Sequence, residues 1–438
     1  MTSKLIDREA PIQGAVVVHP DRDPRGASRS GAARLDEAVG LALALDLEIR
    51  DALIAPLRKP TPATLFGSGK VKEIGELCEA LEVDVAIVDD ALTPVQQRNL
   101  EKAWGVKVID RTGLILEIFA RRARTKEGRL QVELARLSYE KSRLVRTWTH
   151  LERQRGGFGV MGGPGETQIE TDRRLIAEKI AKLKRDLVEV RRTRTLQRAA
   201  RQRAPAPSVA LVGYTNAGKS TLFNRLTQSD VVAQDMLFAT LDPTLRTLKL
   251  PDGRPAVLSD TVGFISDLPH ELVEAFRATL EEVKEADVIL HVRDISSDES
   301  DAQAQDVRKV LSRLGVEMSE RRVIEVWNKL DLTDESDREI LRGDALRSSP
   351  AAVPLSAVSG EGCETLLGMI ADLVDEASPV GIDIPAGEGA ALAWLYRHGR
   401  ILSRSDAISG DISVAVSLSE QALGQFEQAF PRLEPKAL

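Results

Sequence analysis

One short segment restricts the fold more than any other part of the chain. An apolar run, Val209–Val212, leads directly into Gly213-Tyr214-Thr215-Asn216-Ala217-Gly218-Lys219-Ser220. This segment has the Gly-x-x-x-x-Gly-Lys-Ser spacing of a phosphate-binding loop, in which backbone N–H groups surround a phosphate at a helix N-terminus. We expect Lys219 to reach the β- and γ-phosphate oxygens and the Ser220 hydroxyl to bind Mg²⁺. Such a loop joins a strand to a helix, so the segment predicts an α/β domain built on a parallel sheet.

Three later motifs indicate which nucleotide binds. Each follows an apolar run: Asp260-Thr261-Val262-Gly263, Asn328-Lys329-Leu330-Asp331 and Ser356-Ala357-Val358. The last aspartate of Asn-Lys-x-Asp can accept hydrogen bonds from N1 and N2 of guanine, whereas adenine would leave this carboxylate unsatisfied. The segment 356–358 suits a backbone contact to the oxygen of the base. Because the carboxyl ends of parallel strands meet at one edge of a sheet, the motifs predict a single site for GTP or GDP there.

The chemistry of the side chains suggests their roles in this site. Gly263 can sense the γ-phosphate through its N–H group, and Thr240 is our candidate for a threonine that closes over the metal. Together with Lys219 they form the predicted catalytic group, and the predicted Mg²⁺ ligands are Ser220, Thr240 and, through water, Asp260. The complete set predicted to bind GTP is Gly213, Tyr214, Thr215, Asn216, Ala217, Gly218, Lys219, Ser220, Thr221, Asp260, Gly263, Asn328, Lys329, Asp331, Ser356, Ala357 and Val358.

The rest of the chain divides into regions with different patterns. Residues 1–13 form a tail, and short apolar runs alternate with helical patterns over residues 14–121, which predicts a small parallel α/β unit. Residues 122–203 are basic and helical, residues 204–378 contain the nucleotide motifs, and residues 379–438 form a small C-terminal domain. The predicted class is α/β: a phosphate-loop GTPase domain, an N-terminal α/β domain with a long antiparallel helical hairpin, and a small α+β domain.

The basic region is expected to form the hairpin. Apolar residues recur at alternating spacings of four and three from Leu130 to Leu151, and again from Ile169 to Val190. Between them, Gly156–Gly165 is too rich in glycine to continue a helix. Residues 121–203 carry 23 lysines and arginines against 10 acidic residues, in a chain of net charge −7. This charge favours a polyanionic partner, although it is also compatible with a solvated helix pair.

Composition excludes several classes of protein. The two cysteines, Cys78 and Cys363, rule out a disulfide framework, and the five histidines lack metal-ligand spacing. No stretch approaches 18 uncharged apolar residues, and the charged start is unlike a signal peptide. We expect a cytoplasmic protein, associated with a membrane at most in part and without stable insertion. The apolar seams are satisfied within one chain, so a monomer is expected, and DNA is not an expected partner.

Several segments together resemble the HflX family of ribosome-associated GTPases. They are the glycine-rich loop running into Glu166–Arg174, the phosphate loop with Thr221, Phe238–Pro243, Asp260–Ile265 and Leu268–His270. The resemblance covers residues from about 14 to about 376 and implies a protein that binds the large (50S) ribosomal subunit and its rRNA and dissociates stalled or idle ribosomes under stress. It also implies that the loop approaches the peptidyl transferase centre, through Gly156, Gly157, Phe158, Gly159, Gly162, Gly163 and Gly165.

Two alternative functions and one mechanistic expectation accompany this resemblance. The chain could be a GTP-switched adaptor that docks without splitting ribosomes, or an ATP-driven RNA remodeller that uses its N-terminal domain. Separately, Gly67-Ser68-Gly69-Lys70 resembles half a phosphate loop, but the residues around it indicate a helix start. Phe264 occupies the position where many GTPases carry a water-positioning glutamine, so we predict hydrolysis that is slow alone and faster on the ribosome. Related GTPases use an asparagine at the position of Asn216 to bind K⁺; alternatively, Asn216 only caps the loop.

Overall fold

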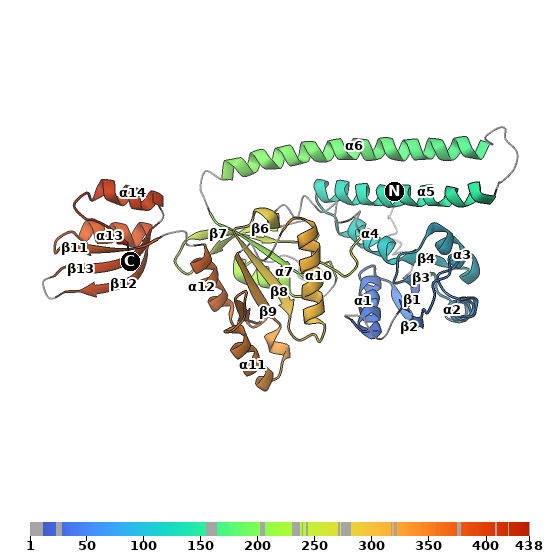
Figure 1. Cartoon of the computed structure of the whole chain (residues 1–438), viewed down its shortest axis with the longest axis horizontal. Helices are drawn as coiled ribbons and strands as arrows, with labels where there is room; N and C mark the ends of the chain where they lie inside the picture. Colours follow the sequence, from blue (N-terminus) through green and yellow to red (C-terminus); the bar gives the residue numbers. More distant parts are fainter. Residues whose placement is uncertain are drawn as a thin grey trace, which may run out of the picture.

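The fold is described from a computed structural model of the whole chain. The structure describes residues 12–22, 29–154, 164–201, 206–229, 237–238, 240–241, 244–269, 272, 282–316, 318, 322–374, 378–407, 410–418 and 420–437. For residues 144–154, 164–169, 191, 193–201, 378–379, 400, 420–421 and 437 only the backbone is described. Three units, each with its own sheet, follow one another along the molecule, and a long helical hairpin lies alongside the N-terminal unit and extends over the middle one (Figure 1). This arrangement confirms the predicted fold class.

The N-terminal unit is a four-stranded parallel sheet covered by helices on both faces. Its elements are β1 (Gly14–Asp21), α1 (Gly31–Leu43), β2 (Glu48–Pro56), α2 (Ser68–Ala80), β3 (Val85–Val88), α3 (Pro94–Trp104), β4 (Lys107–Asp110) and α4 (Arg111–Arg122). The strand order is β2-β1-β3-β4, and the apolar runs of β1 and β3 are buried in its centre. Helices α1 and α4 contribute Leu41 and Phe119 to one core, whereas α2 and α3 contribute Ile74 and Leu100 to the other.

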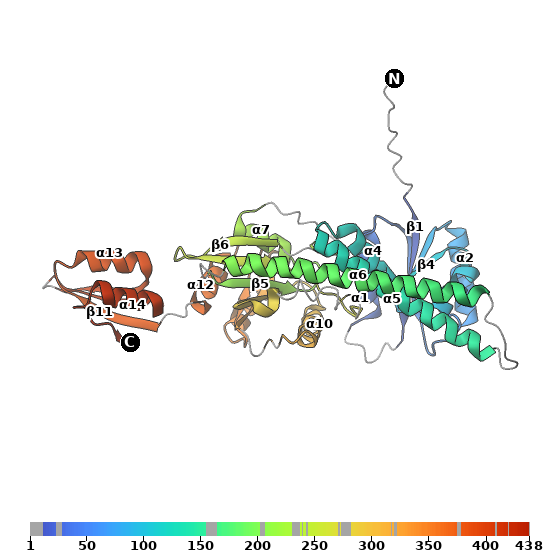
Figure 2. The same ribbon diagram turned by 90° about the horizontal axis from the view of Figure 1, so that it is seen from above.

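The basic region forms the predicted hairpin. Helix α5 (Lys126–Gln154) has 29 residues and helix α6 (Pro164–Arg201) has 38. Both views show them side by side, with α6 running on beyond α5 towards the second unit (Figures 1 and 2). On α6, Leu183 and Leu187 are buried. Most of the predicted tip loop, Gly156 to Gly163, lies outside the described residues, and Gly165 is in the first turn of α6.

The second unit contains the nucleotide motifs on a six-stranded sheet. Its elements are β5 (Ser208–Gly213), α7 (Lys219–Thr227), β6 (Thr244–Lys249), β7 (Pro255–Asp260), β8 (Val288–Asp294), α10 (Ser300–Arg313), β9 (Arg322–Asn328), η2 (Leu330–Leu332), α11 (Glu335–Ala345), β10 (Ala352–Pro354) and α12 (Cys363–Leu373). The order is β10-β9-β8-β5-β7-β6, and every neighbouring pair is parallel except β6 and β7. Helices α7 and α12 pack on one face through Phe223 and Leu366, and α10 packs on the other through Val307. The loops after β5, β7, β8 and β9 therefore meet at one edge.

The C-terminal unit is a small antiparallel sheet with two helices. Its elements are β11 (Ser378–Ile384), α13 (Gly389–His398), β12 (Arg400–Asp406), β13 (Ile412–Leu418), α14 (Glu420–Ala429) and β14 (Lys436–Ala437), and the strand order is β12-β13-β11-β14. Leu395, Val416 and Phe426 lie in its core. β11 begins at Ser378, one residue before the predicted domain boundary. The unit lies at the far end of the molecule from the N-terminal unit (Figure 1).

Candidate functional site

The phosphate-loop segment is fixed against the central strands of the second unit. β5 ends at Gly213 and α7 begins at Lys219. Two glycines of the segment have no room for a side chain: a Cβ atom on Gly213 would lie 2.2 Å from the carbonyl oxygen of Val292, and one on Gly218 would lie 2.2 Å from Nδ2 of Asn328. Gly218 also has a φ of 87°, a conformation that only glycine adopts readily. The loop is therefore held at the carboxyl edge of β8 and β9 by close backbone approach.

Lys219 is buried beneath this loop. Its Nζ donates hydrogen bonds to the carbonyl oxygens of Gly213, at 3.1 Å, and Tyr214, at 2.7 Å. Burial lowers the pKa of Lys219 to about 8, and the nearby carboxylate of Asp260 partly offsets this effect. Gly263 lies directly beside the ammonium group, because a Cβ atom on Gly263 would be 3.1 Å from Nζ. The structure thus brings Lys219 and Gly263, two of the three predicted catalytic residues, into contact distance.

Three oxygen-bearing side chains converge next to Lys219. The Ser220 Oγ donates to Oδ2 of Asp260 at 2.9 Å and lies 2.8 Å from Oγ1 of Thr240. Asp260 is fully buried, which raises the pKa of its carboxyl, and its Oδ1 has no hydrogen-bond partner among the residues that the structure describes. Hydroxyl and carboxylate oxygens are the ligands that Mg²⁺ prefers, and an orphaned buried carboxylate oxygen needs a cation or water. The donor set therefore fits the predicted magnesium site.

Asn328, at the end of β9, connects the phosphate side of the site to the base side. Its Nδ2 donates to the carbonyl oxygen of Ala217 at 2.8 Å, and its Oδ1 accepts a hydrogen bond from the N–H of Ala357 at 3.0 Å. The next residue, Lys329, has a positive φ of 67°, and its Nζ lies 2.8 Å from Oδ2 of Asp294. The ends of β8, β9 and β10 are thereby tied to the phosphate loop.

The remaining predicted base-contacting residues follow the same strand ends. Asp331 lies in η2, directly after β9, and is exposed. After β10, Ser356 is fully buried, whereas the side chain of Val358 is 67% exposed. These residues stand at the same edge as the phosphate loop. Their contact with a guanine base stays a prediction.

Phe264 is buried beside the phosphate loop. Its side chain is 2% exposed, and its backbone is held by hydrogen bonds to both sides of the phosphate loop. The Phe264 N–H donates to Gly213 O at 3.1 Å, and the Thr215 N–H donates to Phe264 O at 2.7 Å. Asn216 is exposed and has a φ of 60°, and Thr221 lies in the first turn of α7. The role of Asn216 in K⁺ binding stays a prediction.

A buried polar cluster, which no sequence motif indicates, joins the phosphate loop to the N-terminal unit. The phenol of Tyr214 donates to Glu37 of α1 and accepts from Arg29 Nη1 at 2.8 Å and from the Ser266 N–H at 2.8 Å. The Ser266 hydroxyl also donates to Glu37 Oε1, at 2.8 Å. Arg111, the first residue of α4, donates to the same carboxylate and, at 3.0 Å, to the carbonyl oxygen of Ser266.

Charge balance holds this cluster together. Burial alone would raise the pKa of Glu37, but Arg111 and Arg29 outweigh burial and hold it below its ordinary value. Burial would also raise the pKa of Asp89, which directly follows β3, but the ion pair with Arg111 holds this pKa below its ordinary value. Asp89 also pairs with His19 at 2.8 Å. No short-range pattern could have revealed the cluster, because Glu37 and Tyr214 lie 177 residues apart.

The segment before Thr240 also contacts the N-terminal unit. The ring of Phe238 packs edge-on against Phe119 of α4, with ring centroids 4.6 Å apart. Leu237 packs against α1, where a Cβ atom on Gly40 would lie 3.1 Å from Leu237 Cδ1. Both chain segments that flank the magnesium site, around residues 238 and 266, are therefore packed on the N-terminal unit.

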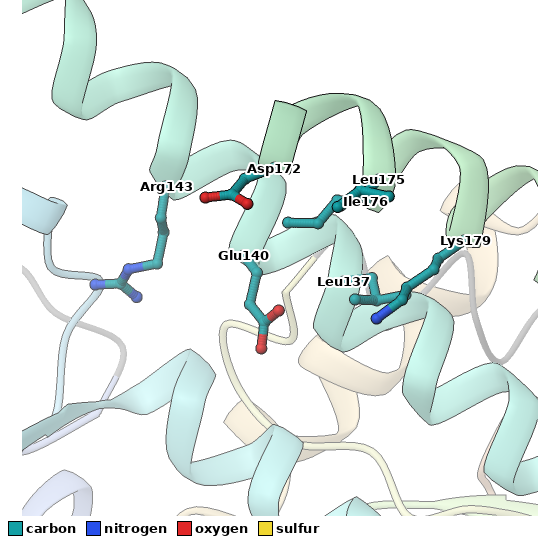
Figure 3. Close-up of a pocket in the computed structure, with 7 residues that line it drawn as sticks. All are labelled: Leu137, Glu140, Arg143, Asp172, Leu175, Ile176 and Lys179. Carbon is teal, nitrogen blue, oxygen red and sulfur yellow. The ribbon is translucent and has the colours of Figure 1, made fainter. Parts of the chain in front are cut away.

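The hairpin contains an apolar cleft of about 580 Å³ between its helices. Figure 3 shows Leu137 of α5 and Leu175 and Ile176 of α6 lining the cleft, with charged residues around them. Arg143 also lines the cleft, and its guanidinium is bound to α3, where Nη2 donates to Gln97 Oε1 at 2.6 Å. The hairpin is thus anchored on the N-terminal unit, which leaves α6 as its outer helix.

The segment that resembles half a phosphate loop begins a helix of the N-terminal unit. The segment Gly67–Lys70 is the start of α2, with Gly67 as N-cap, and Lys70 pairs with Glu73 at 2.8 Å. In the described ranges, no group of three His, Cys, Asp or Glu side chains is placed to hold a metal ion. Within those ranges there is also no helix with the length and apolar character needed to cross a membrane.

Comparisons with known proteins identify the family of this chain. Family models match along the chain: "GTP-binding GTPase N-terminal" at residues 32–120, "GTP-binding GTPase Middle Region" at 122–201, "50S ribosome-binding GTPase" at 208–329 and "HflX C-terminal domain" at 344–436. GTPase HflX of Magnetococcus marinus is 51% identical over 397 residues, 90% of each chain. GTPase HflX of Escherichia coli is 41% identical over 419 residues, 94% of this chain and 95% of its own. A GTP-binding protein of Sulfolobus solfataricus, solved with GDP, covers 83% of this chain and 98% of its own at 25% identity and a TM-score of 0.45. The chain belongs to the HflX family of GTPases.

Proposed function

We propose that this GTPase binds the large ribosomal subunit through its N-terminal unit and basic hairpin, and separates stalled or idle ribosomes into subunits. The observation that carries the proposal is the direct connection between the nucleotide site and the N-terminal unit through Tyr214, Glu37 and Ser266. A change of nucleotide that moves the phosphate loop or residue 266 must also disturb this buried cluster. The match of residues 208–329 to the model of 50S ribosome-binding GTPases supports the choice of partner.

The basic hairpin supports rRNA as the contacted surface. Its region carries more than twice as many lysines and arginines as acidic residues. Such charge favours binding to a phosphate backbone, with an affinity that falls as salt rises. The glycine-rich tip, proposed to include Gly156, Gly157, Phe158, Gly159, Gly162, Gly163 and Gly165, would enter a narrow RNA cleft. We also propose that the protein acts as a monomer in the cytoplasm.

The residues of the site assign the roles in hydrolysis. Lys219 would neutralise charge on the β- and γ-phosphates, and the Gly263 N–H would donate to the γ-phosphate. Ser220, Thr240 and Asp260 would hold Mg²⁺, which supplies charge stabilisation to the phosphates when bound. Because Phe264 is buried and carries no hydrogen-bonding group, the isolated protein has no side chain at that position to orient water. We therefore propose slow hydrolysis alone and faster hydrolysis on the ribosome.

The test is GTP hydrolysis with and without isolated 50S subunits, combined with sedimentation of 70S particles. A splitting GTPase should be stimulated by 50S subunits and should convert 70S particles into subunits with a non-hydrolysable GTP analogue. An adaptor would bind 70S particles and leave the ratio of 70S particles to free subunits unchanged. Turnover of the pure protein at roughly 1 s⁻¹ or faster, far above unassisted GTPase rates, would contradict the proposed dependence on the ribosome.

A further inference from the structure

Arg225, in the last turn of α7, reaches the loop that follows β10. Its Nε donates to the carbonyl oxygen of Ala357 at 3.1 Å, and its Nη2 donates to the carbonyl oxygen of Val358. The guanidinium also lies against Gly360, because a Cβ atom there would be 3.8 Å from Cζ of Arg225. Gly360 has a φ of 92°, so the loop turns sharply around the guanidinium. No nucleotide motif includes Arg225.

The peptide groups around Ala357 are consequently held from two directions. Asn328 accepts a hydrogen bond from the Ala357 N–H, and Arg225 donates to the carbonyl oxygen of the same residue. Asn328 also donates to Ala217 in the phosphate loop, which leads directly into α7. The phosphate loop, Asn328, Ala357 and Arg225 thus form a closed ring of contacts. The ring ties the loop after β10 to the phosphate loop and to the end of α7.

The loop keeps its own shape by separate local contacts. The Ser356 N–H donates to Glu361 O at 3.0 Å, and the Gly360 N–H donates to Ser356 O at 2.8 Å. In addition, the Ser359 N–H donates to Ser356 Oγ at 3.0 Å. Since Arg225 takes no part in these contacts, its two hydrogen bonds determine where the loop lies relative to α7. They are not needed to form the turn.

We propose that Arg225 is a positioning residue for guanine recognition: by fixing the carbonyl groups of Ala357 and Val358, it sets the amides of this loop at the distance that a 6-oxo purine requires. The proposal rests on the assignment of residues 356–358 to the base and is independent of any ribosomal role. Arg225 acts on the base side alone, since the base lies at this end of the nucleotide and the phosphates lie at the other. Its loss must therefore weaken the binding of nucleotides that carry a 6-oxo group.

The experiment measures the affinity of the full-length protein for GDP, IDP and ADP, by displacement of a fluorescent GDP analogue. IDP keeps the 6-oxo group but lacks the 2-amino group, and ADP lacks both. The variant Arg225→Met keeps the side-chain stem and removes both donors. We expect it to weaken GDP and IDP binding by the same factor, about tenfold for two hydrogen bonds from a charged group, and to leave ADP binding unchanged. In GTP hydrolysis, KM should rise while kcat at saturation is unchanged.

Two further variants complete the design. Arg225→Lys keeps the charge, but its single ammonium cannot span both carbonyl groups as a planar guanidinium does, so its loss should be intermediate. Arg246→Met is the matched control, because the exposed Arg246 of β6 donates to the carbonyl of its own neighbour, Leu245. If Arg225→Met proves unstable in thermal unfolding, Arg225→Lys carries the same comparison of GDP, IDP and ADP. An unchanged GDP affinity, or an equal loss for ADP, would overturn the proposal.

Discussion

Replacement of Arg111 by methionine should destabilise the N-terminal unit strongly at neutral pH. Arg111 is 7% exposed and pairs with two buried carboxylates, Glu37 and Asp89. Methionine has a similar volume but leaves both carboxylates without their main counterion. Breaking a buried ion pair from one side costs about 3–5 kcal/mol, since the remaining charge stays buried. Removing a counterion shared by two carboxylates should fall at the upper end, about 5 kcal/mol.

The pH dependence of this loss gives a sharper test than its size. In the native protein the pKa values of Glu37 and Asp89 are lowered by their ion pairs. The two ionised carboxylates therefore stabilise the folded protein at neutral pH, and this stabilisation is lost as pH falls through those pKa values. In Arg111→Met, burial without the counterion should raise both pKa values above those of the unfolded chain. The folded variant then binds more protons than the unfolded chain, and its stability should improve as pH falls. The difference in free energy of unfolding between the native protein and Arg111→Met should therefore shrink from pH 7 towards pH 4.

The assay is urea unfolding followed by tryptophan fluorescence, with Trp104 of the N-terminal unit as the buried reporter. A triple variant, Arg111→Met with Glu37→Gln and Asp89→Asn, removes all three charges and should recover much of the loss, because a neutral cluster has no uncompensated charge. The reasoning fails if Arg111→Met costs less than about 1 kcal/mol at pH 7, or if its deficit is the same at pH 4.

Three shorter predictions concern the nucleotide site. Gly218→Ala should add about 1–3 kcal/mol of backbone strain and push against Asn328, so the GDP dissociation constant should rise by at least about tenfold; an unchanged constant would contradict the close approach seen here. Asp331→Asn should weaken GDP binding by roughly a hundredfold and favour XDP. Competition between the two nucleotides measures this change, and a retained preference for GDP would exclude the assigned role of Asp331. The affinity for GDP should fall as pH rises above about 8, because the free protein loses the Lys219 proton that the phosphates require; a constant affinity up to pH 9.5, in calorimetric titrations, would show that the proton stays on Lys219.

Local spacing explains what could be predicted from the sequence. The phosphate loop and the motifs after β7, β9 and β10 are each defined by a few adjacent residues, and the parallel sheet brings them to one edge. The contacts of Ser220 with Asp260 and Thr240 follow from this shared edge. The long hairpin follows equally directly from a repeated apolar spacing interrupted by glycines.

Two kinds of feature could not be predicted in this way. Strand β2 has no clear apolar run, because Glu48–Pro56 mixes charged and apolar residues, as an edge strand with little burial can. In the C-terminal unit, β12 likewise has a mostly polar sequence, Arg400–Asp406. The interdomain cluster depends on long-range pairing: Glu37 and Ser266 are 229 residues apart, and each alone is an ordinary polar residue.

Tyr214 takes part both in the nucleotide site and in the interface with the N-terminal unit. Its carbonyl oxygen accepts from Lys219 inside the nucleotide site, and its phenol donates to Glu37 in the N-terminal unit. Tyr214→Phe should remove the hydroxyl group without disturbing the loop backbone, leaving the buried N–H of Ser266 without its acceptor. Such a loss costs about 1–3 kcal/mol, so unfolding should shift to lower urea concentration.

The same variant separates attachment of the two units from nucleotide binding. Because the ring and backbone of Tyr214 are retained, GDP affinity of the Phe variant should stay within about twofold of the native value, whereas the interface weakens by the full cost of the lost hydrogen bond. The matched comparison is Ser266→Ala, which removes the hydroxyl bond to Glu37 but keeps the N–H donor to the phenol. If Tyr214→Phe instead weakened GDP binding as much as it weakened the fold, the phenol would be part of the nucleotide site itself. Nucleotide binding and the attachment of the N-terminal unit would then be coupled through this hydroxyl group.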